Sequence, residues 1–447
     1  MKKIWLFSLA LFFILTLGLT VQATQINRPI KPDSSSALNG GSLGEKINVA
    51  ASEFLDERNP AVAVCGDYYL VAYERGGDIY GQRINMSGEL VGEPIQIYSG
   101  TYNSSNPDVA CLWPYIFDQY FVVVWDYDYD GDQEDYDVYA QVIYPDGSLF
   151  STAIPVANRS SSREMKPTIA CEVDSNYCLV VFEDWGEGYR NVYGQRLHLI
   201  NFGLEPYGDL FDPGSDADDD IDPDLTWSMD RGEYLLVWSD WYAGSSGGHF
   251  RAVFSMIYEE EQGDGASEIK NGPYWLIDPS EPGHDTGQRF PVVAYNNLSG
   301  RSLVAFQENA SGLNNVIGVL LEGYSQVGDP LVVAEEVYDR PAVAFSGGET
   351  GAVNAMDEFL IVTPELSEGE YRLEGAYVWK SHLTAANPLI TPASSTNLFQ
   401  EPAVTGSPQN GNYLVVWEEA NSAGYDIYGQ LYDNGEYHDI FLPLILR

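Results

Sequence analysis

The chain repeats one pattern seven times, and this repeat restricts the fold more than any other feature. Each copy opens with the block Pro-x-[Val/Ile/Leu]-[Ala/Thr]. The copies begin at Pro60, Pro107, Pro167, Pro223, Pro291, Pro341 and Pro402, so that 47 to 68 residues separate one from the next. A spacing of this size predicts one small β- or α-unit per copy, with the units stacked against one another.

Two further blocks follow the Pro block within a copy. The first is an uninterrupted apolar run, such as Tyr120–Trp125 or Tyr413–Trp417, which is typical of a strand covered on both faces. The second is [Asp/Asn]-[Ile/Val]-Tyr-[Gly/Ala]-Gln, which occurs at Asp78–Gln82, Asp137–Gln141, Asn191–Gln195 and Asp426–Gln430 and is degraded in copies four to six. The order predicts a first strand after the Pro, a buried second strand, an alternating third strand and a short fourth strand.

Four-stranded antiparallel units of this length that are covered on both sides are propeller blades. We therefore predict an all-β fold, a seven-bladed β-propeller. The sixth copy is the weakest, and a six-bladed ring is the alternative if it is not a blade. The last copy lacks a fourth strand, and Gly44–Val49 reads like Gly92–Ile97, a fourth strand of the first copy. An N-terminal strand is expected to complete the last blade and close the ring, which removes exposed sheet edges.

The ends of the chain look different from the repeats. Two lysines, an apolar run and Val21-Gln22-Ala23 form the pattern of an export signal, predicted as residues 1–23, although an uncleaved anchor is the alternative. A flexible arm is expected over 24–43, the propeller over 44–432 and a tail over 433–447. The tail ends in Leu-Pro-Leu-Ile-Leu-Arg, which is interpreted either as a sorting signal or as a strand docked on the ring. The protein is thus expected to be secreted or held at the cell surface, with no membrane insertion of the mature chain.

Charge and cysteine content agree with that location. The 66 acidic and 22 basic residues give a net charge of −44, which repels phosphate backbones and argues against nucleic-acid binding. Cys171 and Cys178 flank a turn between two apolar runs, so a hairpin would bring them within bonding distance. Cys65 and Cys111 are left over, and their pairing stays open.

The blade pattern, as in Leu414-Val-Val-Trp417-Glu418 followed by Asp426-Ile-Tyr-Gly-Gln430, resembles the repeats of secreted bacterial β-propeller proteins, many of unassigned function. The resemblance extends over about residues 44 to 432. It implies the blade architecture and says almost nothing about activity.

One loop breaks the repeat with closely spaced acidic residues. It fits Asp-x-Asp-x-Asp-Gly, and its candidate metal ligands are Asp126, Asp128, Asp130, Asp132 and Asp137. Alternating carboxylates around a Gly turn can converge on one hard cation, and oxygen ligands suit Ca²⁺. A structural calcium ion is therefore predicted, although no helices flank the loop and Asp stands where an EF-hand has Glu. A solvated acidic hairpin tip is the alternative, and it is the favoured interpretation of a second acidic run, 216–224.

Carboxylates also recur at the ends of second strands, at Glu74, Asp126, Glu183 and Glu418. Because they recur with the repeat, we expect them to fix loop geometry by accepting backbone N–H bonds rather than to act in catalysis. Weak catalytic candidates are His284, Asp285 and Arg289, in the segment before the fifth copy. Arg58, Arg289 and Arg340 precede blade-opening prolines, and an anion site near the axis is a further hypothesis.

Aromatic residues outside the repeat suggest a binding surface. The candidate ligand-binding residues are Trp185, Tyr189, Trp241, Tyr242 and His249. Exposed aromatic rings stack on sugars or anchor protein partners, whereas packing against a neighbouring blade is the ordinary alternative. The favoured function is recognition of a carbohydrate or protein ligand. A polysaccharide hydrolase or lyase and a structural envelope component are the alternatives, and no feature of the sequence identifies the ligand.

Overall fold

The chain divides into two compact units, Met1–Ala37 and Leu38–Arg447, and all residues that the computed structural model describes belong to the second. The described residues are 42–52, 55–114, 119–160, 162–186, 188–200, 203–214, 218–244, 247–259, 267–277, 287–310, 313–347, 358–367, 370–379, 382–385, 394–395, 397–422 and 424–433. The predicted export signal, most of the predicted arm and all but the first residue of the predicted tail lie outside them.

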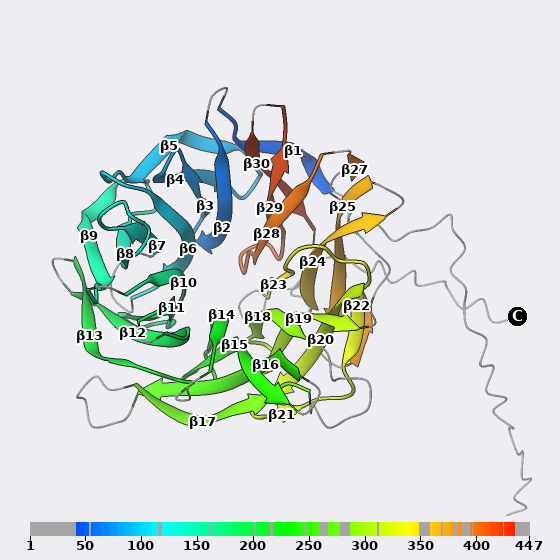
Figure 1. Ribbon diagram of the computed structural model, residues 1–447. Helices are drawn as coiled ribbons and strands as arrows, with labels where there is room; N and C mark the ends of the chain where they lie inside the picture. The colour runs from blue at the N-terminus through cyan, green and yellow to red at the C-terminus, as the bar shows by residue number, and fades with distance from the viewer. Residues whose placement is uncertain are drawn as a thin grey trace, which may run out of the picture. The chain divides into compact units, whose positions relative to one another are not determined.

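The described strands form seven antiparallel sheets arranged around a central axis, which confirms the seven-bladed propeller (Figure 1). Blade one contains β2 (Glu57–Cys65), β3 (Tyr68–Arg75), β4 (Asp78–Asn85) and β5 (Leu90–Tyr98). Blade two contains β6 (Ser104–Leu112), β7 (Tyr120–Asp128), β8 (Tyr136–Ile143) and β9 (Leu149–Ala157). Blade three contains β10 (Glu164–Cys171), β11 (Tyr177–Asp184), β12 (Asn191–Ile200) and β13 (Gly203–Phe211).

The second half of the ring is less regular. Blade four contains β14 (Asp220–Ser228), β15 (Glu233–Gly244), β16 (Gly247–Glu259) and β17 (Ser267–Trp275). Blade five contains β18 (Gln288–Asn296), β19 (Arg301–Ala310), β20 (Leu313–Glu322), β21 (Ser325–Gln326) and β22 (Leu331–Ala334). Blade six contains β23 (Ala342–Phe345), β24 (Glu358–Ser367), β25 (Glu370–Trp379), β26 (His382–Ala385) and β27 (Ser394–Ser395). The sixth copy is therefore a blade, despite its degraded sequence.

Blade seven is built from both ends of this unit, as predicted. It contains β28 (Phe399–Gly406), β29 (Tyr413–Ala420), β30 (Tyr425–Tyr432) and, as its outermost strand, β1 (Ser42–Ala50). Ile47 of β1 pairs with Gly429 of β30, and Val49 of β1 is buried. The N-terminal strand thus closes the ring by completing the last blade.

The hydrophobic core lies between neighbouring blades. Each described core cluster joins one blade to the next, and the second strands supply its centre because both of their faces are covered. The residues of β7 are all buried, for example. Trp125, Trp238 and Trp417 are completely buried within second strands, which confirms their assignment to the core rather than to a site.

One disulfide lies within a blade and the other joins two neighbouring blades. Cys171 and Cys178 close the β10–β11 hairpin, as predicted, with their Cα atoms 3.9 Å apart. Cys65 and Cys111 pair with each other across blades one and two, with a Cα separation of 5.2 Å. Disulfides of this kind are consistent with an oxidising, extracellular environment.

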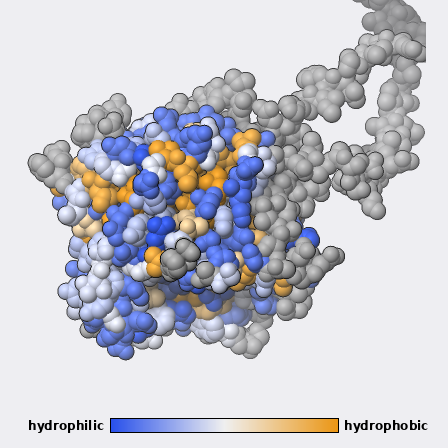
Figure 2. Space-filling view, turned by 90° about the horizontal axis from the view of Figure 1, so that it is seen from above, coloured by the Kyte–Doolittle hydropathy of each residue, from blue (hydrophilic) through white to orange (hydrophobic). Residues whose placement is uncertain are grey.

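The surface seen at the edge of the ring is mostly hydrophilic, with hydrophobic residues showing between the polar ones (Figure 2). No helix in the described part of the chain is long and apolar enough to span a membrane. We call the side of the ring that carries the connections between blades and the loops after second strands the crossover face. The segments 99–103 and 129–135 lie on it.

Candidate functional site

A cavity of about 400 Å³ lies on the axis of the ring and is lined by the blade-opening segment of every blade. Each blade contributes its Pro together with the residues before and after it. The residues before the prolines are Asn59, Asn106, Lys166, Asp222, Phe290, Arg340 and Glu401. The repeat fixes the Pro but leaves the preceding position free to vary, so that the lining differs chemically from blade to blade. Sequence reasoning did not single out this ring, although variation beside a constant Pro was a visible signal.

The backbone before the prolines adopts an unusual conformation that the sequence did not predict. In six of the seven blades the first strand begins before the Pro, not after it, and a β-bulge interrupts its pairing with the second strand at this point, as between Arg58 and Ala61; in blade six, β23 begins after Pro341, as the sequence predicts. In blade one Asn59 has a φ of 50°, and the equivalent residues of five other blades have φ values between 49° and 54°. This left-handed conformation is costly for residues other than glycine, so it needs compensating contacts.

The carboxylates at the ends of second strands supply those contacts. Glu74 accepts the backbone N–H of Asn106 at 2.7 Å, and Asp126 accepts that of Lys166 at 2.9 Å. Glu183 accepts the backbone N–H of Asp222 at 3.0 Å. Each carboxylate therefore holds the bulge of the next blade, which confirms the predicted structural role and argues against a ring of catalytic acids.

Blades four to six depart from this arrangement. Ser239, Gln307 and Thr363 stand where the other blades have a carboxylate. The Glu401 N–H is instead accepted by Asp339, a cavity-lining residue, at 2.8 Å. The blades with degraded sequence repeats are thus also those that lack the carboxylate at the end of the second strand. This sector of the crossover face is where residues specific to function are expected.

Deeper in the cavity, two carboxylates meet at one hydroxyl group. The hydroxyl of Thr168 lies 3.1 Å from Oδ2 of Asp108 and 3.3 Å from Oδ1 of Asp224. Asp108 also accepts the backbone N–H of Ile169 at 2.8 Å, and Asp224 that of Val293 at 2.7 Å. Burial raises the pKa of Asp108, and burial together with the nearby Asp108 charge raises the pKa of Asp224 to about 7. Both residues depart from the repeat, because the position after the Pro is Ala or Val in the four blades outside this group.

The proposed arginine trio does not assemble at the axis. Arg340 lines the cavity, whereas Arg58 pairs with Asp56 at 3.2 Å and stacks on the Tyr425 ring. Arg289 pairs with Asp222 at 2.8 Å. Lys166 is the other basic residue among those lining the cavity, and its Nζ lies 3.0 Å from Oε1 of Glu183. Because these basic groups have acidic partners, the anion-site hypothesis gains no support.

The candidate catalytic group is only partly described. His284 and Asp285 lie outside the described residues, so the structure does not place them. Arg289 is described. Its guanidinium covers the rings of Phe250 and Phe290, with centroid distances of 4.6 and 4.8 Å. Since Phe290 lines the axial cavity, Arg289 connects the cavity to the aromatic residues of blade four.

The aromatic candidates of blade three are less open than their sequence suggests. Trp185 is 42% exposed, but the guanidinium groups of Arg163 and Arg190 lie 5.4 and 5.3 Å from its ring centroid. Cations at such distances bind the ring face that a sugar would need. Tyr189 is half-buried. The two arginines thus already occupy the ring face of Trp185 on which a sugar would stack.

Blade four offers an aromatic corner in which the Trp275 ring is the more open one, because the guanidinium of Arg251 lies 5.2 Å from the centroid of the Tyr242 ring. Tyr242 lies near the end of β15 and is 37% exposed, and its ring meets the Trp275 ring at 5.9 Å with an interplanar angle of 74°. Trp275 ends β17 and is 46% exposed. His249 faces Tyr242 across the hairpin. The predicted Tyr242 and His249 therefore come together, and with them lies Trp275, which the sequence analysis missed because it belongs to a fourth strand rather than to the loop after a second strand.

A second row of side chains, on the other face of the β15–β16 hairpin from Tyr242, leads to the axis. Trp241 is half-buried and packs edge-on against Phe250, with ring centroids 5.0 Å apart. Phe250 in turn lies beneath Arg289, which also covers Phe290 at the axial cavity. Trp241 is consequently the outer end of a row that reaches the axial cavity through Phe250, Arg289 and Phe290.

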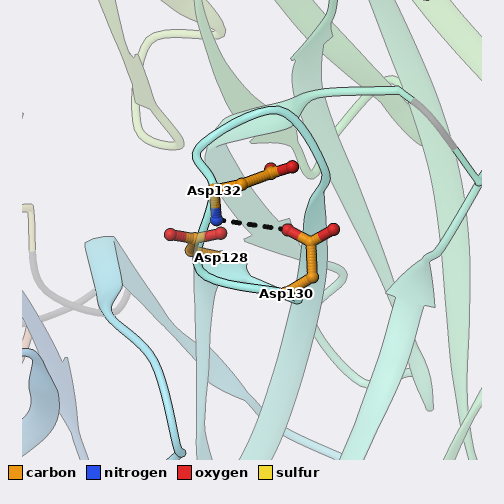
Figure 3. A group of neighbouring side chains, drawn as sticks. All are labelled: Asp128, Asp130 and Asp132. Carbon is orange, nitrogen blue, oxygen red and sulfur yellow. Dashed lines mark hydrogen bonds between the residues drawn. The ribbon is translucent and has the colours of Figure 1, made fainter.

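The acidic loop of blade two brings three of its five candidate ligands together. One carboxylate oxygen from each of Asp128, Asp130 and Asp132 lies within 4.8 Å of the others (Figure 3). Asp128 is buried and accepts the backbone N–H of Gly131 at 2.9 Å. Gly131 has a φ of 83°, and a Cβ at this position would lie 2.4 Å from the Tyr102 ring, so the turn requires glycine.

The remaining two candidates lie outside this group. Asp126 belongs to β7, and its carboxylate holds the backbone of Lys166 and the side chain of Asn106. Asp137 belongs to β8, and burial together with the nearby Asp135 charge raises its pKa to about 6. A cation at the loop would thus be held by Asp128, Asp130 and Asp132.

Comparisons with known proteins show distant similarity of structure only. No family model matches the sequence, and neither does any curated protein. An α-L-arabinanase of Penicillium chrysogenum in complex with arabinobiose has 10% identity and a TM-score of 0.49, with 89% of this chain and 99% of that chain covered. A Trypanosoma rangeli sialidase in complex with the inhibitor DANA has 9% identity and a TM-score of 0.46, and the match covers 86% of this chain but only 60% of the sialidase. A GH93 α-L-arabinofuranosidase of Fusarium graminearum in complex with arabinobiose has 8% identity and a TM-score of 0.45, covering 89% and 98%. At these values the activities of the three enzymes are not transferred to this chain.

Proposed function

We propose that this protein is an exported recognition module whose crossover face binds carbohydrate. The observation that carries the proposal is the open corner of Tyr242 and Trp275, which provides an exposed indole ring beside a second ring at 74°. Sugar rings present flat C–H faces that stack on such aromatic side chains, while their hydroxyl groups stay with polar neighbours.

The distribution of exposed aromatic residues supports this choice of face. Those on the crossover face are Tyr102, Tyr129, Trp185 and Tyr242, with Trp275 beside Tyr242, whereas Tyr274 lies on the outer strand β17 and Trp113 and Tyr324 lie on the opposite face. The row from Trp241 to Phe290, on the other face of the same hairpin, leads to a cavity of about 400 Å³, a volume within the range of ligand pockets. A short glycan could lie along this row with one end at the axis.

A protein ligand is the alternative partner for the same surface. Protein interfaces need a larger apolar centre, whereas here charged groups such as Arg190 and Arg289 interrupt the aromatic residues. His249 and Arg251 lie beside the Tyr242 ring, and such polar neighbours suit the hydroxyl groups of a sugar.

Calcium is proposed as a structural partner of the acidic loop. Three carboxylates within 4.8 Å repel one another unless a cation or protons neutralise them. The loop lies in blade two, away from the corner of blade four, so the ion would stabilise the loop rather than bind the ligand.

A polysaccharide hydrolase is the second candidate function, and the paired Asp108 and Asp224 in the axial cavity favour it. Their oxygens meet at the Thr168 hydroxyl, and glycosidases use two carboxylates a few ångströms apart. Against this function, both carboxylates already accept backbone N–H bonds, as structural groups do.

The test measures retardation of the mature protein, with Ca²⁺, in gels that contain a panel of soluble polysaccharides. Trp275→Ala should weaken binding about tenfold, the factor that corresponds to roughly 1.4 kcal/mol of lost stacking. Trp113→Ala is the matched control, because it removes an exposed indole from the opposite face, and it should leave binding unchanged. Equal binding by Trp275→Ala and the unaltered protein would contradict the proposed corner. New reducing ends that disappear in Asp224→Asn would favour the hydrolase.

A further inference from the structure

The face opposite the crossover face, which carries the turns after first and third strands, exposes aliphatic side chains. Six of the nine exposed large aliphatic residues in the described part of the chain lie on it: Leu43, Leu90, Leu149, Val173, Ile200 and Met229. Aliphatic side chains lack the flat rings with polar edges that suit sugars, so this face fits an apolar partner.

Three apolar side chains of this face lie on the inner turns of neighbouring blades. Trp113 and Val173 follow the first strands of blades two and three, and they form a β-bridge with each other. Met229 follows the first strand of blade four. The hairpin that carries it is tied to blade three, because the Tyr234 hydroxyl donates to Oε1 of Glu172 at 3.1 Å. We call Trp113, Val173 and Met229 the inner apolar group, and all three are exposed.

The described part of the chain ends on the same face. β30 runs from the crossover face to Tyr432, which pairs with Ser42 of β1. The Tyr377 hydroxyl donates to the carbonyl oxygen of Asp433 at 2.6 Å and so holds the point from which the chain continues. The segment 434–447 follows, and it contains the apolar run 440–446. An apolar run thus starts from a face that exposes apolar side chains.

We propose that the apolar run 440–446 of this chain binds to the inner apolar group. Contact between them removes apolar surface of both partners from water, which is favourable. Pro443 disfavours a helix and holds the residue before it in an extended conformation, so the run suits a shallow surface. This inference is independent of the sugar ligand, because the proposed sugar corner belongs to the crossover face.

The segment is long enough to reach the inner apolar group. Blades three and four lie across the axis from blade seven (Figure 1). With sheets packed about 10 Å apart, seven first strands enclose a ring roughly 20 Å across, and β30 lies two strand spacings, about 10 Å, outside it. The path is therefore roughly 30 Å, whereas 434–446 spans up to about 43 Å at ~3.3 Å per extended residue. The group is reached within the apolar run.

Charge favours the chain's own segment over other apolar partners. Each chain has a net charge of −44, so that two copies brought together by this face would repel each other. An anionic membrane surface is disfavoured for the same reason. The run 440–446 has no charged residue, and it is already attached to the face that it would cover.

The first experiment introduces cysteine pairs into the full mature chain, whose own cysteines are all held in disulfides. Under mild oxidation, Met229→Cys with Leu444→Cys should form about tenfold more intramolecular disulfide than Asn410→Cys with Leu444→Cys. Asn410 is the matched control, because it lies in the exposed turn after the first strand of blade seven, on the same face. Peptide mass spectrometry measures both pairs. Equal linking would indicate a free segment and overturn the proposal, and links between two chains would overturn binding within one chain.

The second experiment gives opposite signs for a bound and a free segment. The triple variant Leu442→Ser, Leu444→Ser, Leu446→Ser would uncover the inner apolar group, so the dye ANS, which fluoresces on exposed apolar surface, should gain about twofold in fluorescence. If the segment is free, the same variant only removes exposed leucines, and an unchanged or lower fluorescence would overturn the proposal. Asn434→Ser with His438→Ser, outside the run, is the control and should not change it. Polysaccharide binding should be unaffected in both variants, so that failure here leaves the proposed function standing.

Discussion

Single side chains fix the backbone conformation of the residue before a blade-opening Pro. In six blades this residue has a left-handed backbone, and in blades one to four a carboxylate of the preceding blade holds its N–H group, as Glu74 holds Asn106. The same carboxylate also accepts the side-chain amide of Asn59. A recurring acidic residue thus has a structural purpose, and this could be predicted from its recurrence. The β-bulge before the Pro could not be predicted from the sequence, because it depends on the pairing between two strands.

Replacement of Glu74 tests this role. Glu74→Ala leaves the buried N–H of Asn106 without its acceptor and should lower the free energy of unfolding by about 1–3 kcal/mol. Glu74→Gln keeps an acceptor oxygen and should cost less. Urea unfolding followed by tryptophan fluorescence measures both, with Glu93→Ala as an exposed control on β5. If Glu74→Ala and Glu93→Ala are equally stable, the carboxylate does not hold the bulge.

Element boundaries decide which residues of the acidic loop come together. β7 continues to Asp128 and β8 begins at Tyr136, so the free loop spans only 129–135. Asp126 and Asp137 are fixed by the ladders of their strands, and the converging group is reduced to Asp128, Asp130 and Asp132. The spacing of aspartates predicts a cation site in this loop. It could not show how far the two strands extend into the motif.

Calcium removal tests the loop as an element. The double variant Asp128→Asn, Asp130→Asn should have a lower melting temperature than the unaltered protein only when Ca²⁺ is present. At a free Ca²⁺ concentration 100 times Kd, binding adds about 2.7 kcal/mol to the stability of the folded state, and the variant would lose this contribution. Asp67→Asn, in the exposed β2–β3 turn, is the control. Identical melting curves with Ca²⁺ and with chelator would rule out a structural calcium ion.

At the scale of the whole molecule, many carboxyl groups are held inside an already acidic ring. Burial raises the pKa of Glu164, Asp224 and Glu358 to about 7, and that of Asp126 to about 6. Each folded-state pKa lies above the unfolded value, so protonation favours the folded state. The stabilisation is complete below the unfolded pKa near 4 and is lost as the pH rises through the folded pKa.

The ring should therefore be less stable at pH 8 than at pH 5. Chemical unfolding at both values, with chelator present to remove the effect of Ca²⁺, measures the difference. Asp224→Asn removes one of the titrating groups and should reduce the slope of stability against pH between 5 and 8. A stability that rises toward pH 8 would show that ion pairs, such as that of Lys166 with Glu183, outweigh the cost of burying carboxylates.

The sequence by itself determined the architecture. Seven Pro blocks, continuous apolar second strands and a spare N-terminal strand are local signals repeated many times, and repetition makes each weak signal reliable. The pairing of Cys171 with Cys178 was also predictable, because a short hairpin fixes it. Even the sixth blade followed from its place in the repeat.

The site was decided only by the tertiary structure. Trp275 meets Tyr242, and Asp108 meets Asp224 across Thr168, because different blades bring their strands to one face and one axis. Trp185 looked open in the sequence, but Arg163 and Arg190 cover its ring. These contacts join residues that are tens of positions apart and belong to no repeated pattern. A one-dimensional pattern specifies which face of a strand is buried, whereas the packing of separate strands determines which exposed side chains meet.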